Sequence, residues 1–375
     1  MPEAAAAASS DFPAERVLLD TVGRIGPHED NATTATGETR AGEPFKVSLE
    51  IAEPPLLSRL SVHFPNLPSV DPKVSARVTG ADANFLLIRV AYPDRPAVGG
   101  CTATVVIAEP APSLYLVPEP YPLGFRGDHV AVLSCDDDDV TGKKGSTDCL
   151  VVVPRRRFDA DGGMWYDLQT FSTKTGSWSS RDAAVTETLQ GHYQSRFRPT
   201  RVFSLGEGLM AWVDLRYGIL LCNLLAEEPV MSLIELGPLM PGNTVVFEPN
   251  MDGGLPPLDQ VRDVAFSNGR FRHWRASMFT RTIEESQTWE KYRTFDSAEF
   301  CPGHLCHPCR FPMIWECKQD KLTLSTMIDN TTPTLDRYND DVVYLMTKLD
   351  ARDLNGWVLS INTLTNKVER HAPDR

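Results

Sequence analysis

The stretch CPGHLCHPCR, residues 301–310, contains three cysteines and two histidines, side chains that commonly bind zinc. Cys306 and Cys309 form a CxxC pair. The residues that could complete a tetrahedral site are Cys301, His304 and Cys317. Structural zinc sites usually combine two short ligand pairs that lie well apart in the sequence, and a second pair is missing here. We therefore interpret these cysteines as unligated thiols in a long loop, and zinc remains the one candidate cofactor.

Other arrangements that could perform chemistry are weakly marked. CxxC also occurs in redox proteins, but there it opens a helix beside a βαβ unit, and that context is missing. GEGLMA, 206–211, resembles a glycine-rich phosphate loop, yet it leads into a strand pattern instead of a helix. The aspartates of CDDDDVTGKKGSTD, 135–148, are consecutive, whereas calcium loops place their ligands at alternate positions, so we interpret them as a solvated loop. The side chains that could supply acid–base groups, if they converged, are His192, His273, Asp214 and Asp263.

Charge and hydropathy restrict the possible partners. The formal net charge of −13 and the pI near 5.1 argue against nonspecific binding to nucleic acid or anionic membranes, because both need a positive surface. No apolar run of about 18 residues predicts a membrane span, and MPEAAAAASS lacks the basic start and apolar core of a secretory signal. We expect a cytoplasmic or nuclear protein whose eight cysteines are free thiols.

The elements that must position these residues are most clearly seen in 200–236. Four apolar runs, separated by short polar or glycine-containing turns, predict strands at 202–205, 209–215, 219–224 and 230–236. Because each turn is too short to contain a helix, consecutive strands must pair antiparallel. This segment therefore predicts one four-stranded antiparallel unit.

The same pattern recurs along the chain. A second unit is expected from the runs 130–135, 149–153, 164–171 and the strand around Trp178. A C-terminal unit is expected from 322–328, 342–348, 357–361 and 367–370. Asn268-Gly269 predicts a hairpin between two strand-like runs, and less regular units are expected within 45–64 and 85–117. Trp165 and Trp212 lie 47 positions apart, a spacing typical of propeller blades.

Twisted four-stranded units bury their faces by stacking against neighbours. We therefore predict an all-β, β-propeller-like fold of about six four-stranded antiparallel blades. A pair of irregular β-sandwiches is the alternative. The expected boundaries are a disordered tail at 1–11, a single domain at 12–371, and a long loop inserted in it at 277–320.

Several stretches together resemble a plant family, expanded in grasses, called domain of unknown function 1618. They are RVLLD (16–20), NATTATGETRAGEPFKVSLEIAEPPLLSRLSVHFP (31–65), WYDLQTFSTKTGSWSSR (165–181), GEGLMAWVDLRYGILLCNLL (206–225) and VRDVAFSNGRFRHW (261–274). The resemblance runs from about 12 to 370 and is most specific in WVDLRYGILLCNLL, within the part from about 200 to 295. Arg16 stands where the family usually has tryptophan, and the cysteines of 301–317 do not belong to its pattern. The family implies no agreed activity, substrate or cofactor, so it assigns no functional residues.

Three function classes remain. We favour a noncatalytic scaffold that binds a protein partner, because a propeller displays variable loops at both ends. A ubiquitin-ligase substrate receptor is suggested by YDLQTFSTKTGSW, 166–178, which is similar to blades of F-box-associated and kelch propellers. Such a receptor needs a helical F-box. Only LLSRLSVHFPNLP, 56–68, faintly resembles one, and its pattern is typical of a strand. The third class is an enzyme with its site in the propeller channel.

Overall fold

Strands make up nearly all of the regular structure in the computed structural model, which confirms the predicted all-β class. The described part of the chain has one short helix, α1 (Glu187–Gly191), which is not long and apolar enough to cross a membrane. The structure describes residues 17–39, 42–66, 74–91, 102–106, 112–118, 130–135, 148–191, 197–237, 258, 262–267, 270–274, 277–282, 288–294, 299–304, 306, 315–318, 321–324, 329–348 and 356–373.

The N-terminal sheet has nine strands. They are β1 (Leu18–Leu19), β2 (Val22–Ile25), β3 (Ala35–Glu38), β4 (Pro44–Glu50), β5 (Leu57–His63), β6 (Ser75–Asp82), β7 (Phe85–Ala91), β8 (Thr102–Val106) and β9 (Ser113–Leu116). β3, β4 and β5 form one antiparallel group, and β6 to β9 form another. β2 joins the two groups, because it pairs in parallel with β5 and antiparallel with β6. β1 also pairs with β5 in parallel.

The second sheet has eight strands. They are β10 (Ala131–Cys135), β11 (Asp148–Phe158), β12 (Met164–Ser172), β13 (Ser177–Val185), β14 (Arg201–Gly206), β15 (Leu209–Asp214), β16 (Gly218–Asn223) and β17 (Val230–Glu235). Two antiparallel groups of four strands meet where the end of β13 pairs in parallel with the start of β17. The outer strands of the two groups therefore pair with each other, so the two groups form one continuous sheet and not two separate sheets.

The remaining strands form three smaller sheets. One contains β18 (Asp263–Ser267), β19 (Arg270–Trp274), β20 (Ser277–Thr282) and β21 (Glu290–Thr294). The C-terminal sheet contains β25 (Asp329–Leu335), β26 (Val342–Lys348), β27 (Trp357–Asn362) and β28 (Lys367–Pro373), with β22 (Cys301–Pro302) added in parallel to β28. A separate hairpin consists of β23 (Trp315–Lys318) and β24 (Lys321–Leu324).

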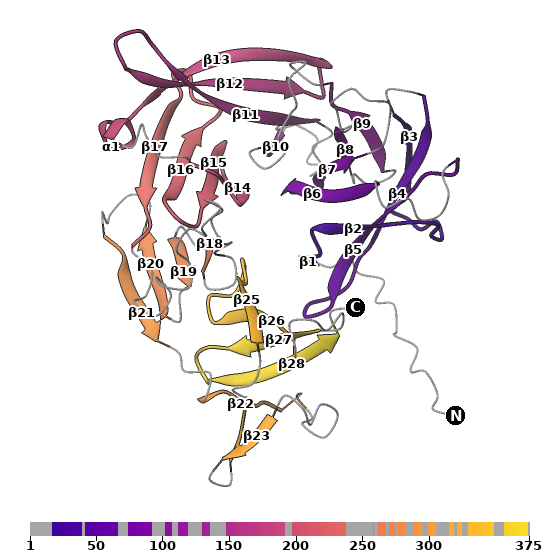
Figure 1. Ribbon diagram of the computed structural model, residues 1–375, viewed down its shortest axis with the longest axis vertical. Helices are drawn as coiled ribbons and strands as arrows, with labels where there is room; N and C mark the ends of the chain where they lie inside the picture. Colours follow the sequence, from indigo (N-terminus) through magenta and orange to yellow (C-terminus); the bar gives the residue numbers. More distant parts are fainter. Residues whose placement is uncertain are drawn as a thin grey trace, which may run out of the picture.

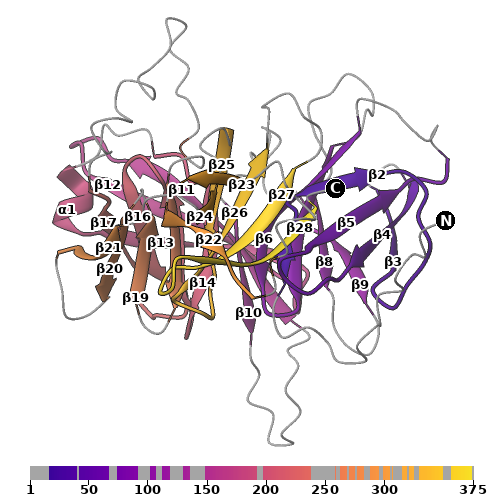
Figure 2. The ribbon, with the colours of Figure 1, turned by 90° about the horizontal axis from the view of Figure 1, so that it is seen from below.

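These sheets follow one another in chain order round a ring (Figure 1). Strands β6, β10, β14, β18 and β25 lie nearest the centre of that ring, and β9, β13, β17 and β21 lie further out. The C-terminal sheet returns to the neighbourhood of β1 and β5. Figure 2, turned by 90°, shows that the strands of the sheets form a flattened body.

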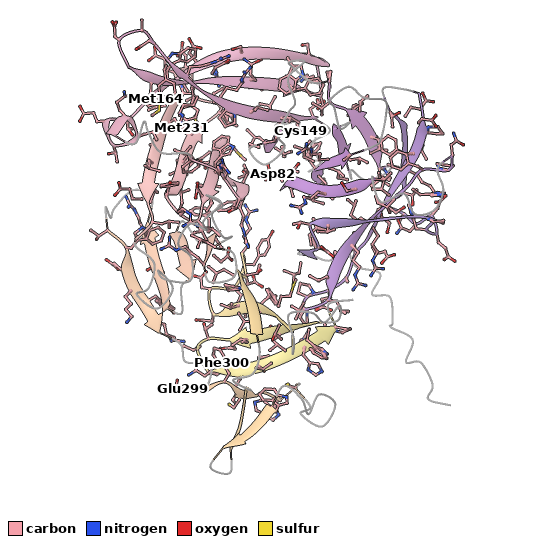
Figure 3. The ribbon with its side chains drawn as sticks, viewed as in Figure 1. Asp82, Cys149, Met164, Met231, Glu299 and Phe300 are labelled. Atoms are coloured by element: carbon pink, nitrogen blue, oxygen red, sulfur yellow. The ribbon has the colours of Figure 1, made fainter. Side chains whose placement is uncertain are left out.

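A hydrophobic cluster fills each contact between consecutive groups of strands, because both faces of most groups carry apolar side chains. In the N-terminal sheet, Val62 of β5 belongs to the same cluster as Ile88 of β7. Leu87 of β7 then packs in a cluster with Val132 and Val151 of the second sheet. Met164 and Met231, both labelled in Figure 3, share a cluster with the fully buried Trp212.

The next two contacts continue round the ring. Val213 and Ile219 pack in a cluster with Val264 of β18. Phe300, which lies beside the C-terminal sheet in Figure 3, shares a cluster with Leu359 and with Ala265 of β18.

The smallest cluster joins the last sheet to the first. Leu57 of β5 packs with Tyr344 and Val358 of the C-terminal sheet. At the surface of this contact the guanidinium of Arg370 lies 3.6 Å from the carboxylate of Glu53, and both side chains are largely exposed. Among the described strands, none from the N-terminal sheet enters the C-terminal sheet, and the described parts of these two sheets meet through side chains.

Polar groups near the centre also tie the sheets together. Asp263 is fully buried, and its Oδ1 lies 2.7 Å from a guanidinium nitrogen of Arg201 at the start of β14. Its other oxygen accepts a hydrogen bond of 2.8 Å from the backbone N–H of Leu335 at the end of β25. The adjacent Arg262, 1% exposed, donates to the carbonyl oxygens of Leu215 and Gly237. One dipeptide therefore holds the four-stranded sheet to the sheets on both sides.

The strands expected in 200–236 are confirmed, and so is the unit that contains Trp165. Ser267 lies opposite Arg270 in the β18–β19 pair, as the Asn268-Gly269 hairpin requires.

The first strand expected in the C-terminal unit, 322–328, is wrong. Leu322 and Leu324 belong to the separate β23–β24 hairpin, and the strand that pairs with β26 is β25. β25 begins with the polar sequence Asp-Asn-Thr-Thr, whereas the residues before it are more apolar. The hydrophobic pattern therefore predicts a strand upstream of the true one.

Two further segments, 277–320 and 56–68, contain strands in the structure. The range 277–320, expected to be a long loop, contains β20, β21, β22 and β23. Within 56–68, the segment with a faint likeness to an F-box, residues Leu57–His63 form β5. The expected strand pattern there is therefore confirmed.

We predict that Asp263→Asn lowers the free energy of unfolding by about 2 kcal/mol, because it removes the charge that strengthens the bonds of this buried group to the partly exposed Arg201 and to the N–H of Leu335. Equilibrium urea denaturation, followed by tryptophan fluorescence, measures the change. The matched control is Glu53→Gln, which removes an exposed ion pair and should change the stability by less than about 0.5 kcal/mol. Equal effects of the two substitutions would contradict a central role for Asp263.

Candidate functional site

Three of the metal-ligand candidates, Cys301, His304 and Cys306, lie within the described residues. Cys301 is half-buried with its Sγ 3.7 Å from the carbonyl oxygen of Asn366, whereas His304 is exposed in a turn. Cys306 is buried, and its Sγ lies 3.7 Å from Nδ1 of His371 on β28. Cys309 lies outside the described residues. Within the described residues, no three His, Cys, Asp or Glu side chains are grouped so that they could hold a metal ion.

The pairing of Cys306 with His371 is not apparent from the sequence, because 65 positions separate the two residues. The β22–β28 pairing brings them together. Burial, with a smaller effect of Glu369, raises the pKa of Cys306 to about 11, so this thiol is protonated at neutral pH. It therefore acts as a buried neutral group beside an imidazole, and not as a thiolate nucleophile.

The two aspartates proposed for acid–base chemistry are individually engaged in structural bonds. Asp214, at the end of β15, accepts hydrogen bonds from the backbone N–H groups of Arg198 (2.6 Å) and Arg216 (2.8 Å). Burial raises the pKa of Asp214, and these N–H groups oppose that effect. Asp263 binds Arg201 and Leu335 instead. His192 and the side chain of His273 lie outside the described residues, so the structure gives no reason to combine the four residues in one site.

A different set of residues stands out on the surface. Among the described large apolar side chains, the three most exposed are Tyr338 (64%), Leu225 (62%) and Leu364 (60%). Each lies in a turn between two strands, namely β25–β26, β16–β17 and β27–β28. Isolated exposed apolar residues are common on protein surfaces, so what matters is how these three are held.

The three turns share one local geometry. The backbone N–H of Tyr338 donates to Oδ1 of Asp336 at 2.8 Å, and that of Leu225 donates to Oδ1 of Asn223 at 2.9 Å. The N–H of Leu364 donates in the same way to Oδ1 of Asn362 at 3.0 Å. In each case an Asp or Asn side chain bonds the backbone two residues further on, which fixes the turn and projects the apolar side chain outward.

Further bonds connect these turns. The guanidinium of Arg337 donates to the carbonyl oxygen of Ser204 at 2.6 Å, which links the Tyr338 turn to the end of β14. The N–H of Leu224 donates to the carbonyl oxygen of Gly208 at 2.9 Å, so the Leu225 turn lies over the β14–β15 turn. The N–H of Thr363 donates to the carbonyl oxygen of Asp341 at 2.7 Å, which links the Leu364 and Tyr338 turns. We name Leu225, Tyr338 and Leu364, with the turns that hold them, the turn surface.

The turn surface carries mainly negative charge. Glu207, Glu227 and Glu228 are exposed in the turns next to Leu225. Asp340 lies two residues after Tyr338 and is partly exposed. Each of the three turns also has an arginine beside it, namely Arg181, Arg293 and Arg337, and each of these guanidiniums donates to backbone carbonyl oxygens. The surface therefore combines apolar anchors with exposed carboxylates beside Leu225 and with arginines that are bound to the backbone.

The sequence contains a signal for this surface that strand prediction does not use. The triplets Asp336-Arg-Tyr338, Asn223-Leu-Leu225 and Asn362-Thr-Leu364 each place Asp or Asn two positions before a large apolar residue, directly after a strand-like run. Such turns bond locally, so they can be recognised without knowledge of the tertiary structure. Their connection through Arg337 cannot be recognised in this way, because its partner is 133 positions away.

A second region with functional groups is a polar recess on the N-terminal sheet. It is lined by parts of β2, β4 and β5 and by the segment that follows β2, and its volume is about 580 Å³. Its lining includes the polar side chains of Arg24, His28, Glu29, Ser48, Glu50 and Ser61. The alternation of β4 and β5 explains its polarity, because Phe45, Val47 and Leu49 point to the core while their neighbours point to the recess.

His28 is fixed at the recess by both ring nitrogens. Nδ1 lies 3.4 Å from the carbonyl oxygen of Gly26, and Nε2 lies 2.7 Å from the hydroxyl oxygen of Ser48. The Ser48 hydroxyl is also 2.7 Å from that of Thr34. A serine–histidine contact can activate a nucleophile, but Ser48 is 2% exposed and the group that orients His28 is a backbone carbonyl. These bonds fasten the segment after β2 to the sheet.

Lys46, Asp30 and His63 complete the polar surroundings. The Lys46 ammonium and the Asp30 carboxylate form an ion pair that lowers the pKa of Asp30. The rings of His28 and His63 meet edge to face with centroids 6.2 Å apart. Burial, together with the charges of Lys46 and His28, lowers the pKa of His63, so this histidine is neutral at pH 7.

Comparison with known proteins identifies one family. The family model described as "Protein of unknown function (DUF1618)" matches residues 212–344, beginning at the Trp-Val-Asp-Leu-Arg sequence of β15. No curated protein matches the chain. Among solved structures, the chain is similar to PorZ, an essential bacterial surface component of the type-IX secretion system of Porphyromonas gingivalis, with 8% identity and a TM-score of 0.20. That similarity covers 94% of this chain and 46% of the PorZ chain, and its TM-score is too low to support a shared fold.

We predict that Cys149, Cys222 and Cys306 resist N-ethylmaleimide in the native protein at pH 7.5. Burial raises the pKa of Cys149 to about 12 and those of Cys222 and Cys306 to about 11, so fewer than roughly one thiol in a thousand is ionised. Peptide mass spectrometry measures the labelling, and the same reaction in urea is the control that shows full reactivity. Rapid labelling of native Cys306 would contradict its burial beside His371.

Proposed function

We propose that this chain, which belongs to the DUF1618 family over residues 212–344, is a six-bladed β-propeller that acts as a noncatalytic protein-interaction scaffold. The six units are β1–β5, β6–β9, β10–β13, β14–β17, β18–β21 and β25–β28. Their order round the ring in Figure 1 and the cluster at each of their contacts support this architecture. The parallel pairs β13–β17 and β2–β5 are local additions to it.

The single observation that carries the interaction role is the turn surface. Large apolar side chains cost free energy when they are exposed to water, and a surface contact that covers them recovers about 25 cal/mol for each Å² of apolar area. Leu225, Tyr338 and Leu364 are held outward by the same Asx-type bond, so they cannot readily fold back to cover themselves. Tyrosine is enriched among the residues that contribute most to protein interfaces, so Tyr338 is the main anchor we propose, with Leu225 and Leu364 adding apolar area.

The charges that surround the anchors indicate the chemistry of the partner. Glu207, Glu227 and Glu228 would repel an acidic segment and attract a basic one. The partner we infer is a protein segment that combines lysine or arginine with leucine or aromatic side chains. The formal net charge of −13 acts in the same direction at longer range.

An enzymatic role has less support. An enzymatic role would require His192, His273, Asp214 and Asp263 to converge in one acid–base site. The two aspartates are instead buried separately, and each accepts hydrogen bonds from backbone N–H groups. The receptor role has no specific observation in its favour, since the segment with a faint likeness to an F-box contains β5. We therefore propose the scaffold alone.

Fluorescence anisotropy with two labelled peptides tests the proposal. One peptide alternates lysine with leucine and tyrosine, and the other has glutamate at every lysine position. We expect the lysine peptide to bind and the glutamate peptide to bind at least about tenfold more weakly, because carboxylates surround the anchors. The triple variant Leu225→Ser, Tyr338→Ser, Leu364→Ser should weaken binding of the lysine peptide by at least about tenfold, which requires the three truncations together to remove about 1.4 kcal/mol of binding free energy.

A matched triple variant distinguishes this surface from general hydrophobic or electrostatic attraction. Tyr115, Phe158 and Ile51 are also exposed, at 40%, 52% and 49%, and lie in the N-terminal and second sheets or the turns beside their strands. Their simultaneous replacement by serine should leave the affinity within about twofold of the unmodified protein. If both triple variants lose binding equally, or neither loses it, the turn surface is not the interaction site.

A further inference from the structure

The recess on the N-terminal sheet contains a row of polar side chains set by strand register. Ser61 of β5 lies opposite Ser48 of β4 on one side and Arg24 of β2 on the other. Residues opposite each other across neighbouring strands have Cβ atoms about 5 Å apart and point to the same face. A guanidinium and two hydroxyls therefore line one strip of the recess, and Glu50 lies on the same face two residues beyond Ser48.

Ser61 is the group in this row without a structural task. It is 5% exposed and lines the recess, yet its hydroxyl makes no hydrogen bond within the described part of the chain. Its oxygen is not among the fully enclosed polar atoms of the described residues, so it faces the recess, where a ligand could reach it. Ser48, directly opposite, differs, since its hydroxyl binds His28 and Thr34.

The charged groups at the recess fall into two kinds. Asp30 is neutralised by Lys46, and both nitrogens of His28 are engaged. Arg24, Glu29 and Glu50 are exposed at the recess and form no ion pair within the residues that the structure describes. One cation and two carboxylates are thus available to a ligand.

We propose that this recess binds a small zwitterion of the amino-acid class, through Arg24, Glu29, Glu50 and Ser61. The guanidinium of Arg24 pairs with the ligand carboxylate in the geometry that favours this side chain for carboxylates. Glu50 and Glu29 receive the ammonium group, and the Ser61 hydroxyl gains the hydrogen bond that it lacks in the free protein. The recess volume of about 580 Å³ is within the range of small-molecule sites.

The charge balance also sets a preference among amino acids. Two carboxylates, Glu29 and Glu50, and one guanidinium, Arg24, line the recess, and Arg59 lies opposite Glu50 on β5 outside this lining. A ligand with a basic side chain is therefore favoured over one with an acidic side chain. This inference is independent of the turn surface, which lies on other strands. Its failure would leave the proposed scaffold role unaffected, and failure of the peptide experiment would leave this site unaffected.

Isothermal titration calorimetry on the full chain tests the site with arginine, glycine and glutamate as probes, and with glucose and inorganic phosphate as ligands of other classes. We expect arginine to bind most tightly, glycine to bind more weakly, and glutamate, glucose and phosphate to give no measurable heat. Arg24→Gln should weaken arginine binding by at least about tenfold, because it removes a charge-assisted pair. Ser61→Ala should weaken it by about threefold or more, because it removes one hydrogen bond.

Matched controls show whether a loss of binding belongs to the recess. Arg77→Gln removes an exposed guanidinium from the neighbouring strand β6, and Ser75→Ala removes an exposed hydroxyl from the same strand. Both should leave the affinity within about twofold of the unmodified protein. Ser61→Thr, which adds a methyl group inside the recess and keeps the hydroxyl, should also weaken binding while the melting temperature stays unchanged.

Three results would overturn the proposal. They are an absence of heat with arginine and glycine, equal binding of glutamate and arginine, and unchanged arginine affinity in both Arg24→Gln and Ser61→Ala. Binding of glucose or phosphate without binding of any amino acid would assign the recess to a different ligand class and would overturn it as well.

Discussion

The buried carboxylate of Asp263 is the interaction on which the arrangement of the later sheets depends. This carboxylate is fully buried. It pairs with the guanidinium of Arg201 in the second sheet and accepts a hydrogen bond from the N–H of Leu335 in the C-terminal sheet. A buried charge is tolerated only when its partners are in place, so the three strand groups cannot shift independently. The neighbouring Arg262 adds two backbone carbonyl oxygens to the same junction. The anchors at Leu225, Tyr338 and Leu364 keep their mutual positions because β14, β18 and β25 are held in this way.

Local patterns in the sequence were sufficient for most of the strands. Short turns and apolar runs located β14 to β17, because each of these strands carries its own boundary signals. They were insufficient at β25, whose first residues are Asp-Asn-Thr-Thr and whose place depends on pairing with β26. The parallel joins β13–β17 and β2–β5 were also beyond local patterns, since they involve strands that are distant in the chain. The choice between separate units and continuous sheets is made by tertiary packing.

The candidate sites show the same division. The turn surface could have been recognised from Asp or Asn two positions before an apolar residue, because that bond is local. The row formed by Arg24, Ser61 and Ser48 could not, since it requires the register of three strands. The cysteine-rich stretch, the most conspicuous chemical pattern in the sequence, places Cys306 beside His371, a partner that only the β22–β28 pairing brings close. The reactive residue types of the cysteine-rich stretch therefore indicated the candidate sites less well than the geometry of the turns and the register of the strands.

The way in which the two ends of the chain meet has a consequence for how this architecture can change in evolution. Each strand group is built from one continuous stretch of sequence, and the first and last groups contact each other through Leu57, Tyr344 and Val358 without exchanging a described strand. Duplication or deletion of one whole stretch would therefore keep the antiparallel ladders within each group, while the pairs β2–β6 and β13–β17, which join neighbouring groups, would need new partners. The side chains at the last contact would also need to adapt to a new ring size. A chain closed in this way can gain or lose a unit by a single genetic event, whereas a ring completed by an exchanged terminal strand would need coordinated changes at both ends.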